Sequence, residues 1–181
     1  MSDDINRYHR SADRFGDAVA GMQDWAAASP CEGWTAADVV NHVVGTQRDF
    51  LTAQGVDLGP APDGSADPAH AWRAHDERVR ALLADPAVAG RTYDGFFGPT
   101  TVGATLATFY GFDLVAHRWD LGRAADREER FDDGELDLLE RSVAGFGEHL
   151  YAEGICRPAL APPADADRQT RVLALLGRDA G

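Results

Sequence analysis

Residues 5–25 read INRYHRSADRFGDAVAGMQDW, and the positions of their apolar side chains decide the fold class. These side chains recur every three or four residues, at Ile5, Tyr8, Ala12, Phe15, Val19, Met22 and Trp25. The spacing places them in one stripe along a long amphipathic helix. We expect this helix to continue to Ser29-Pro30, because proline cannot extend it. A stripe of this length has to be buried against other helices.

The next two helices are marked by residues that start helices. Thr35 and Asp38 form a variant of the capping box, and predict a helix that ends near Gly55. Asp67-Pro68 supplies a helix cap and a first-turn proline for a third helix through about Leu83. The Gly- and Pro-rich residues between these two helices are expected to form a connecting loop.

The rest of the chain continues the helical pattern. Helices are expected over residues 101–123, 133–151 and 168–176, with a turn region that has a little extended structure at 92–99. Long helices joined by modest loops predict an all-α fold, an antiparallel four-helix bundle with an additional short C-terminal helix. We expect a single domain over residues 1–181.

The composition excludes several classes of protein. Lys and Arg number 17 against 30 Asp and Glu, a net charge of -13, which argues against binding to nucleic acid or to an anionic membrane surface. The chain shows no apolar segment typical of a signal peptide or a membrane span, so we expect a cytoplasmic protein. Two cysteines, Cys31 and Cys156, are too few for a disulfide scaffold and are expected to be reduced thiols.

Asp113 and His117 are the first candidates for chemistry. They lie four residues apart in a predicted helix, about 40° around its axis and one turn along it. This spacing can aim a carboxylate and an imidazole at one divalent metal ion. A plain ion pair or a solvated helix face would have the same spacing, so the pair alone leaves all three interpretations open.

His42 is a third candidate, from another predicted helix. It lies beside Val43 and Val44, close to the apolar stripe of that helix. Asp38 precedes it by four residues but is explained as a helix cap. The remaining histidines are expected to be surface or packing residues: His9, His70, His75 and His149.

Asp120 is expected to support this site without binding the metal. It lies about 10 Å further along the helix axis than Asp113, too far for both to reach one ion. A histidine that binds a metal usually donates its second ring N–H to a carboxylate, and Asp120 follows His117 by one turn. The alternatives are that Asp120 caps a neighbouring segment or pairs with Arg123.

Three segments, in this order, resemble the signatures of one family. They are PCEGWTAADVVNHVVG at residues 30–45, DLVAHRWDL at 113–121 and RVLALLGRD at 171–179. Together they resemble the mycothiol-dependent maleylpyruvate isomerase-like proteins of actinobacteria, within the DinB-like metal-binding four-helix bundles. The resemblance covers essentially the whole chain and is closest to the short, single-domain members.

This resemblance implies a metal site. The family's bundle holds a divalent metal, commonly zinc, through one ligand from the second helix and two ligands, four residues apart, from a later helix. The matching residues here are His42, Asp113 and His117. Many relatives have histidine in place of Asp113, and the isomerase has glutamate. Two histidines and one carboxylate also suit Fe(II), Ni(II) or Mn(II).

The resemblance also implies an activity. It indicates a metalloenzyme that joins a low-molecular-weight thiol, mycothiol, to a small electrophilic substrate, as an S-transferase or an isomerase. Three protein ligands leave a metal position open for such chemistry. Arg118 and Arg123 are candidates for holding a substrate carboxylate. The isomerase has an additional C-terminal domain that helps to bind thiol and substrate, and we expect this chain to lack it.

Two other functions fit the same ligands. One is a metal-dependent hydrolase that uses a metal-bound water. The other is a non-enzymatic metal-binding or stress-response bundle, with a homodimer as its expected assembly. An enzyme should keep a metal position open, whereas a structural site should be closed.

Overall fold

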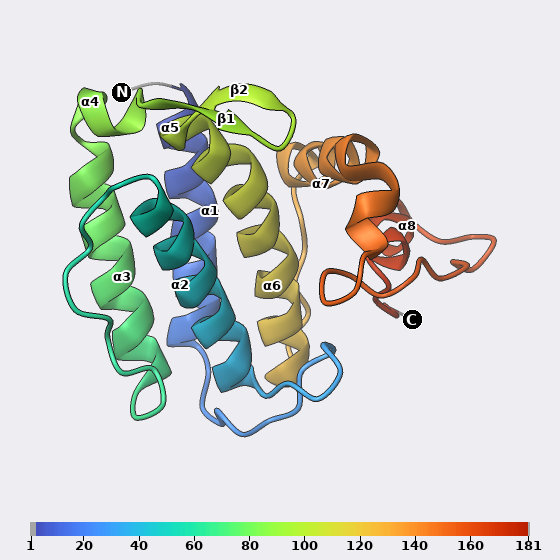
Figure 1. The fold of residues 1–181 in the computed structure, drawn as a ribbon. Helices are drawn as coiled ribbons and strands as arrows, with labels where there is room; N and C mark the ends of the chain where they lie inside the picture. Colours follow the sequence, from blue (N-terminus) through green and yellow to red (C-terminus); the bar gives the residue numbers. More distant parts are fainter. Residues whose placement is uncertain (1–2, 181) are drawn as a thin grey trace. The chain divides into compact units, whose positions relative to one another are not determined.

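The computed structural model describes residues 3–180, which are mostly helical with one small two-stranded sheet (Figure 1). An all-α class therefore fits broadly. The chain groups into two compact units that divide between Glu129 and Arg130, and the single domain predicted over residues 1–181 stays a prediction. Among the described residues, no helix has the length and apolar character needed to cross a membrane.

The first unit contains most of the secondary structure. Its elements in chain order are α1 (Asp3–Ala20), α2 (Ala36–Ala53), α3 (Pro68–Leu83), α4 (Pro86–Ala89), β1 (Thr92–Gly95), β2 (Gly98–Thr101), α5 (Val102–Thr105), the π-helix η1 (Leu106–Tyr110) and α6 (Gly111–Ala124). Both α1 and α2 contact α3 and α6, so these four helices pack side by side (Figure 1).

The predicted apolar stripe is the core face of α1. Tyr8, Phe15 and Val19 are all buried. Phe15 packs edge-on against Trp72 of α3, with 4.7 Å between the ring centroids. Burial of this stripe holds α1 against both α3 and α6.

Helix α1 ends at Ala20, so the prediction that it reaches Ser29-Pro30 is wrong. The guanidinium of Arg127 donates a hydrogen bond of 3.0 Å to the carbonyl oxygen of Ala18. In a longer helix the amide of residue 22 would bond this carbonyl, so Arg127 takes the place of the next turn. Met22 stays buried beyond the end of the helix, and the apolar spacing therefore continues without the helix.

The predicted starts of α2 and α3 are confirmed. Thr35 caps α2, and the Asp38 carboxylate accepts hydrogen bonds from the amide of Thr35, at 2.9 Å, and from its hydroxyl. These bonds lower the pKa of Asp38. Asp67 caps α3 by accepting from the amide of His70, and Pro68 occupies the first turn. Asp38 is therefore used as a helix cap, as expected.

The helix predicted over residues 101–123 is confirmed as continuous helical backbone from Val102 to Ala124, but a π-helix that the prediction did not include separates α5 from α6. Leu106 and Tyr110 of this π-helix are both buried. The Tyr110 hydroxyl donates to the carbonyl oxygen of Thr46 in α2, at 3.2 Å. Such π turns are common beside functional sites, and this one directly precedes the turn of α6 that carries Asp113.

The turn region predicted at residues 92–99 contains extended structure, as expected. Strands β1 and β2 pair antiparallel, with Thr92 opposite Thr101 and Gly95 opposite Gly98. Gly98 has a φ of 102°, a backbone conformation that favours glycine. This hairpin leads directly into α5.

The second unit contains α7 (Asp133–Phe146), the 3₁₀ helix η2 (Gly147–Tyr151) and α8 (Arg168–Leu175). The helix predicted over residues 133–151 is wrong in its last turn, because Gly147 has a φ of 53° and ends the α-helix. The predicted short C-terminal helix is confirmed as α8. Its Arg168 bonds Asp137 and Glu140 of α7, at 2.6 and 2.7 Å.

A buried polar network joins α1, α2 and α3. The Tyr8 hydroxyl donates to the side-chain oxygen of Gln47 at 2.7 Å, and His75 Nε2 lies 3.1 Å from the same oxygen. Burial lowers the pKa of His75 to about 4, with a further contribution from the positive charge of Arg48. His75 is therefore neutral at pH 7 and buried in its neutral form.

We expect His75 to make stability depend on pH in mildly acidic solution. Between pH 4 and its ordinary pKa of 6.5, the unfolded chain binds a proton at this residue that the folded protein does not. The free energy of unfolding should therefore rise by roughly 3 kcal/mol over this interval because of His75. Urea unfolding of wild type and His75→Gln across the interval measures this contribution as the difference between the two curves.

The control is His149→Gln, which changes an exposed histidine of the second unit. Its free energy of unfolding should change with pH in parallel with that of wild type. A His75→Gln curve that is also parallel to wild type would contradict the buried, neutral state of His75.

Candidate metal centre

The three predicted metal ligands lie together between α2 and α6. His42 comes from α2, and Asp113 and His117 come from successive turns of α6. His42 Nε2 lies 3.7 Å from Asp113 Oδ2, and His117 Nε2 lies 3.3 Å from Asp113 Oδ1. One ligand atom from each residue lies within 4.8 Å of the other two. A single ion placed among them could therefore contact both imidazoles and the carboxylate.

One oxygen of this cluster lacks the partner that burial demands. Asp113 Oδ2 is buried and has no hydrogen-bond partner among residues 3–180. His42 Nε2 lies 3.7 Å from this oxygen, which is too long for a hydrogen bond. A buried carboxylate oxygen is costly unless it is bonded or binds a metal. The donor set of two imidazoles and one carboxylate, with one carboxylate oxygen facing each imidazole, fits a divalent metal.

Asp120 lies against the other nitrogen of His117. Its Oδ2 is 2.8 Å from His117 Nδ1, and the Asp120 side chain is fully buried. This is the contact that we expected of Asp120, because such a carboxylate fixes the tautomer and orientation of a metal-binding imidazole. Nε2 of His117 is then left to face Asp113 and His42. The effect of Asp120 on metal binding stays a prediction.

Two residues of the segment before α2 complete the cluster. The Cys31 thiol lies 3.4 Å from Asp120 Oδ2, and both cysteines of the chain are thiols rather than disulfide partners. The indole of Trp34 lies 4.9 Å from the ring of His42 and 6.0 Å from that of His117, measured between centroids. Sequence reasoning did not assign Trp34 to the site. Trp34 could have been predicted from its position in the sequence, because it directly precedes the Thr35 cap at the end of α2 nearer to His42.

The metal-free site is held by opposite charges. Burial lowers the pKa of His117, but the charge and hydrogen bond of Asp113, followed by hydrogen bonds with Asp120 and Cys31, more than reverse this and hold the pKa well above 6.5. Burial raises the pKa of Asp113, and the charge of His117, with hydrogen bonding and a contribution from His42, lowers it overall. The two carboxylates therefore favour the protonated form of His117 in the metal-free site.

The family of the chain follows from this region. Residues 7–122, which include all three candidate ligands and Asp120, match the family described as mycothiol maleylpyruvate isomerase N-terminal domain. The chain belongs to this family. Two uncharacterized proteins of Mycobacterium tuberculosis, from strains CDC 1551 and H37Rv, are similar to it at 27% identity. These alignments cover 97% of this chain and 98% of each relative, and no solved structure was found to match.

The other predicted candidates lie outside the ligand cluster of this mycothiol maleylpyruvate isomerase-type domain. Arg118 Nε lies 3.5 Å from Glu129 Oε2, and Arg123 lies over the ring of Trp119. Arg118, which we considered for a substrate carboxylate, therefore faces a carboxylate of the chain itself, and Arg123 is exposed. His70 and His149 are exposed, His9 is partly buried, and His75 belongs to the network with Gln47.

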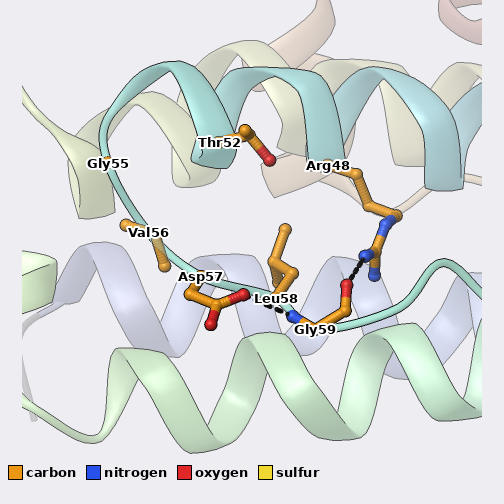
Figure 2. Close-up of a pocket in the computed structure, with 7 residues that line it drawn as sticks. All are labelled: Arg48, Thr52, Gly55, Val56, Asp57, Leu58 and Gly59. Carbon is orange, nitrogen blue, oxygen red and sulfur yellow. Dashed lines mark hydrogen bonds between the residues drawn. The ribbon is translucent and has the colours of Figure 1, made fainter.

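A cavity of about 410 Å³ lies at the end of α2, away from the ligand cluster. Figure 2 shows it between the last turns of α2 and the loop that follows, where Arg48 donates to the carbonyl oxygen of Gly59. The Asp57 carboxylate accepts from the amide of Gly59 at 2.8 Å. None of the three candidate ligands lines this cavity, which is formed by Arg48, Thr52 and residues 55–59.

We expect His117 of the metal-free protein to titrate above 6.5, the ordinary pKa of histidine. Its contribution to stability should be complete below that ordinary pKa and should be lost as the pH rises through the raised pKa. Asp120→Asn removes one of the two carboxylates and should bring the pKa of His117 down. Heteronuclear NMR of the imidazoles measures both values.

The matched control is Asp165→Asn, which neutralises an exposed aspartate of the second unit. It should leave the titration of His117 as in wild type. An unshifted His117 in Asp120→Asn would show that the 2.8 Å contact does not stabilise the imidazolium.

Proposed function

We propose that the protein is a divalent-metal enzyme of the thiol-dependent type, an S-transferase or isomerase that acts on a small electrophilic substrate. The observation that carries the proposal is the Asp113 carboxylate, which lies between the imidazoles of His42 and His117 and has one buried oxygen without a hydrogen-bond partner among the described residues. Membership of the mycothiol maleylpyruvate isomerase N-terminal domain family supports mycothiol as the thiol.

We further propose that the first unit is a DinB-like four-helix bundle. The pairwise packing of α1, α2, α3 and α6 supports this, since each helix contacts two of the others. In this arrangement α2 and α6 are neighbours, and they supply ligands from opposite sides of one interface. The site then depends on bundle packing rather than on a mobile loop.

His42, Asp113 and His117 would hold the metal, with zinc as the expected ion. The same donor set also suits Fe(II), Ni(II) and Mn(II). Three protein ligands leave at least one position for a thiol, and a divalent ion there would favour the thiolate form of that ligand at neutral pH. The His42 side chain is 32% exposed and that of His117 only 8%, so an incoming thiol would approach from the His42 side.

The protein side chains would hold and shield the reacting groups. Asp120 keeps Nε2 of His117 directed at the ligand cluster, because it occupies Nδ1. Trp34 covers parts of both imidazoles and limits access of water from that side. The thiol would lose its proton to solvent, and its sulfur would form a bond to an electrophilic carbon. At the same time either a carbon–carbon double bond of the substrate would open, with its electron pair moving towards a carbonyl group, or a leaving group would depart with the electrons of its bond. Release of the adduct completes a transfer, whereas rotation followed by loss of the thiol completes an isomerisation.

We expect purified protein loaded with Zn(II) to hold about one ion per chain. His42→Ala should remove bound metal but keep the helical circular dichroism, because His42 is partly exposed and lies outside the apolar core. Asp120→Asn should weaken affinity roughly 10–100-fold, as is typical for a carboxylate behind a metal-binding histidine. Elemental analysis and chelator competition measure these effects.

His70→Ala provides the matched control, because His70 is an exposed histidine at the start of α3. It should bind metal as wild type does. Normal metal content in His42→Ala would remove His42 from the ligand set and with it the proposed site.

We also expect the metal-loaded protein to consume mycothiol in the presence of an electrophile. Maleylpyruvate tests the isomerase route, and an activated haloarene tests the transferase route. Activity should require both thiol and metal, because the thiolate is the attacking group. Loss of thiol, formation of adduct and isomerisation of the substrate are followed separately.

His42→Ala is the negative control for this assay, and glutathione tests the choice of thiol. Metal binding without any thiol-dependent turnover would favour the non-enzymatic alternative. Turnover that consumes water and no thiol would favour the hydrolase.

A further inference from the structure

We propose that the turn formed by residues 29–34 positions the imidazoles of His42 and His117 for the metal. The inference rests on the proposed metal site and deepens it. It assigns Cys31 and Trp34 as positioning residues, which act on the ligands and do not bind the ion themselves. We call this segment the 29–34 turn.

The 29–34 turn is held by its own hydrogen bonds. The amide of Ser29 donates a hydrogen bond to the carbonyl oxygen of Trp34 at 2.9 Å. The amide of Trp34 donates a hydrogen bond to the carbonyl oxygen of Cys31 at 3.0 Å. The Ser29 hydroxyl also accepts from the amide of Cys31, at 3.2 Å. Gly33 has a φ of 76°, which a residue with a side chain rarely adopts. The turn therefore has one well-defined conformation, and Gly33 is required for it.

The turn is also fixed at its two ends. Residues 28 and 35 form an isolated antiparallel bridge, and Thr35 is the cap of α2. Because His42 lies two turns into α2, the turn and His42 belong to one continuous, capped segment. The side chains of Cys31 and Trp34 connect the turn to α6, which carries the other two ligands.

Cys31 reaches α6 through Asp120. Its thiol is 3.4 Å from Asp120 Oδ2, the same oxygen that lies 2.8 Å from His117 Nδ1. The thiol and the imidazole therefore share one buried oxygen, and their contacts restrain the carboxylate from two directions. Since Asp120 sets the orientation of the His117 ring, a contact that restrains Asp120 also restrains that ring.

Trp34 acts directly on the rings. Its indole is inclined at only 23° to the plane of His117 and at 48° to that of His42. The ring centroids of the two imidazoles are 5.1 Å apart, and the planes of the rings are inclined at 71° to each other. The flat indole can therefore lie beside both rings without requiring them to be parallel. Loss of the indole would free both rings to rotate away from a common metal position.

The first test uses two glycines in the same backbone conformation. Gly33 and Gly59 have φ values of 76° and 67°, and a Cβ added at either would meet no atom within 4 Å. Gly33→Ala and Gly59→Ala therefore impose a similar backbone strain, at the proposed positioning turn and in a different loop. We expect Gly33→Ala to weaken Zn(II) affinity roughly tenfold, as for loss of support behind a metal ligand, and Gly59→Ala to leave it within about twofold.

The thiol is tested by two substitutions of similar size. Cys31→Ala removes the contact with Asp120 and should weaken Zn(II) affinity several-fold. Cys31→Ser keeps a donor at this position and should retain most of the affinity. The absorption spectrum of bound Co(II) should change in Cys31→Ala and in Trp34→Leu, because the ligand geometry changes. Unchanged affinity and unchanged spectra in Gly33→Ala, Cys31→Ala and Trp34→Leu would overturn the proposal.

A readout without metal separates this inference from the proposed function. In metal-free wild type, the Nδ1 proton of His117 should be observable by NMR because it is held by Asp120. Cys31→Ala should speed its exchange with solvent, whereas Gly59→Ala should not. If wild type binds no metal and this difference is still found, the proposed function fails and the positioning contact holds. If metal binds normally in every variant and the exchange rates are equal, only the positioning proposal fails.

Discussion

The structure of the site depends on one buried imidazole, that of His117, which is held between two carboxylates. His117 lies on α6, and the same helix supplies Asp113 one turn before it and Asp120 one turn after it. A buried charge is tolerated only when it is paired and hydrogen-bonded, so this helix carries the compensation for its own buried charge. The rest of the unit then needs to bring only His42 and the 29–34 turn into contact with a pre-assembled group.

That requirement makes the rotation of α6 about its axis decisive. A rotation of about 100°, the angle of one residue, would turn Asp113 and His117 away from α2. The π-helix before α6 changes the angle around the helix axis at which the side chains of α6 point. The hydrogen bond from the Tyr110 hydroxyl to the carbonyl oxygen of Thr46 in α2 holds the helix at this angle. The irregular helix is therefore directly connected to the geometry of the ligands.

Sequence reasoning could predict the parts of this arrangement that depend on local spacing. The helical period placed Asp113, His117 and Asp120 on one face, and the caps at Thr35 and Asp67 follow from local hydrogen bonds. It could not find the end of α1, because a hydrogen bond from Arg127, more than a hundred residues away, replaces the next turn. Nor could it find the π-helix or the stacking of Trp34, which depend on packing between helices and leave no periodic signal.

The two buried histidines of the first unit show why a neighbouring carboxylate was more informative than burial. His75 is less exposed than His117, yet burial lowers its pKa to about 4, and its Nε2 faces the amide oxygen of Gln47. His117 faces two carboxylates, which raise its pKa against the same effect of burial. Burial of an imidazole therefore leads to a neutral packing residue or to a charged site, depending on the neighbouring groups. The aspartate four residues before His117 reported on those groups, whereas the apolar residues around the histidine did not. The same spacing of Asp38 and His42 reflects a helix cap, so the spacing is informative only where no cap explains it.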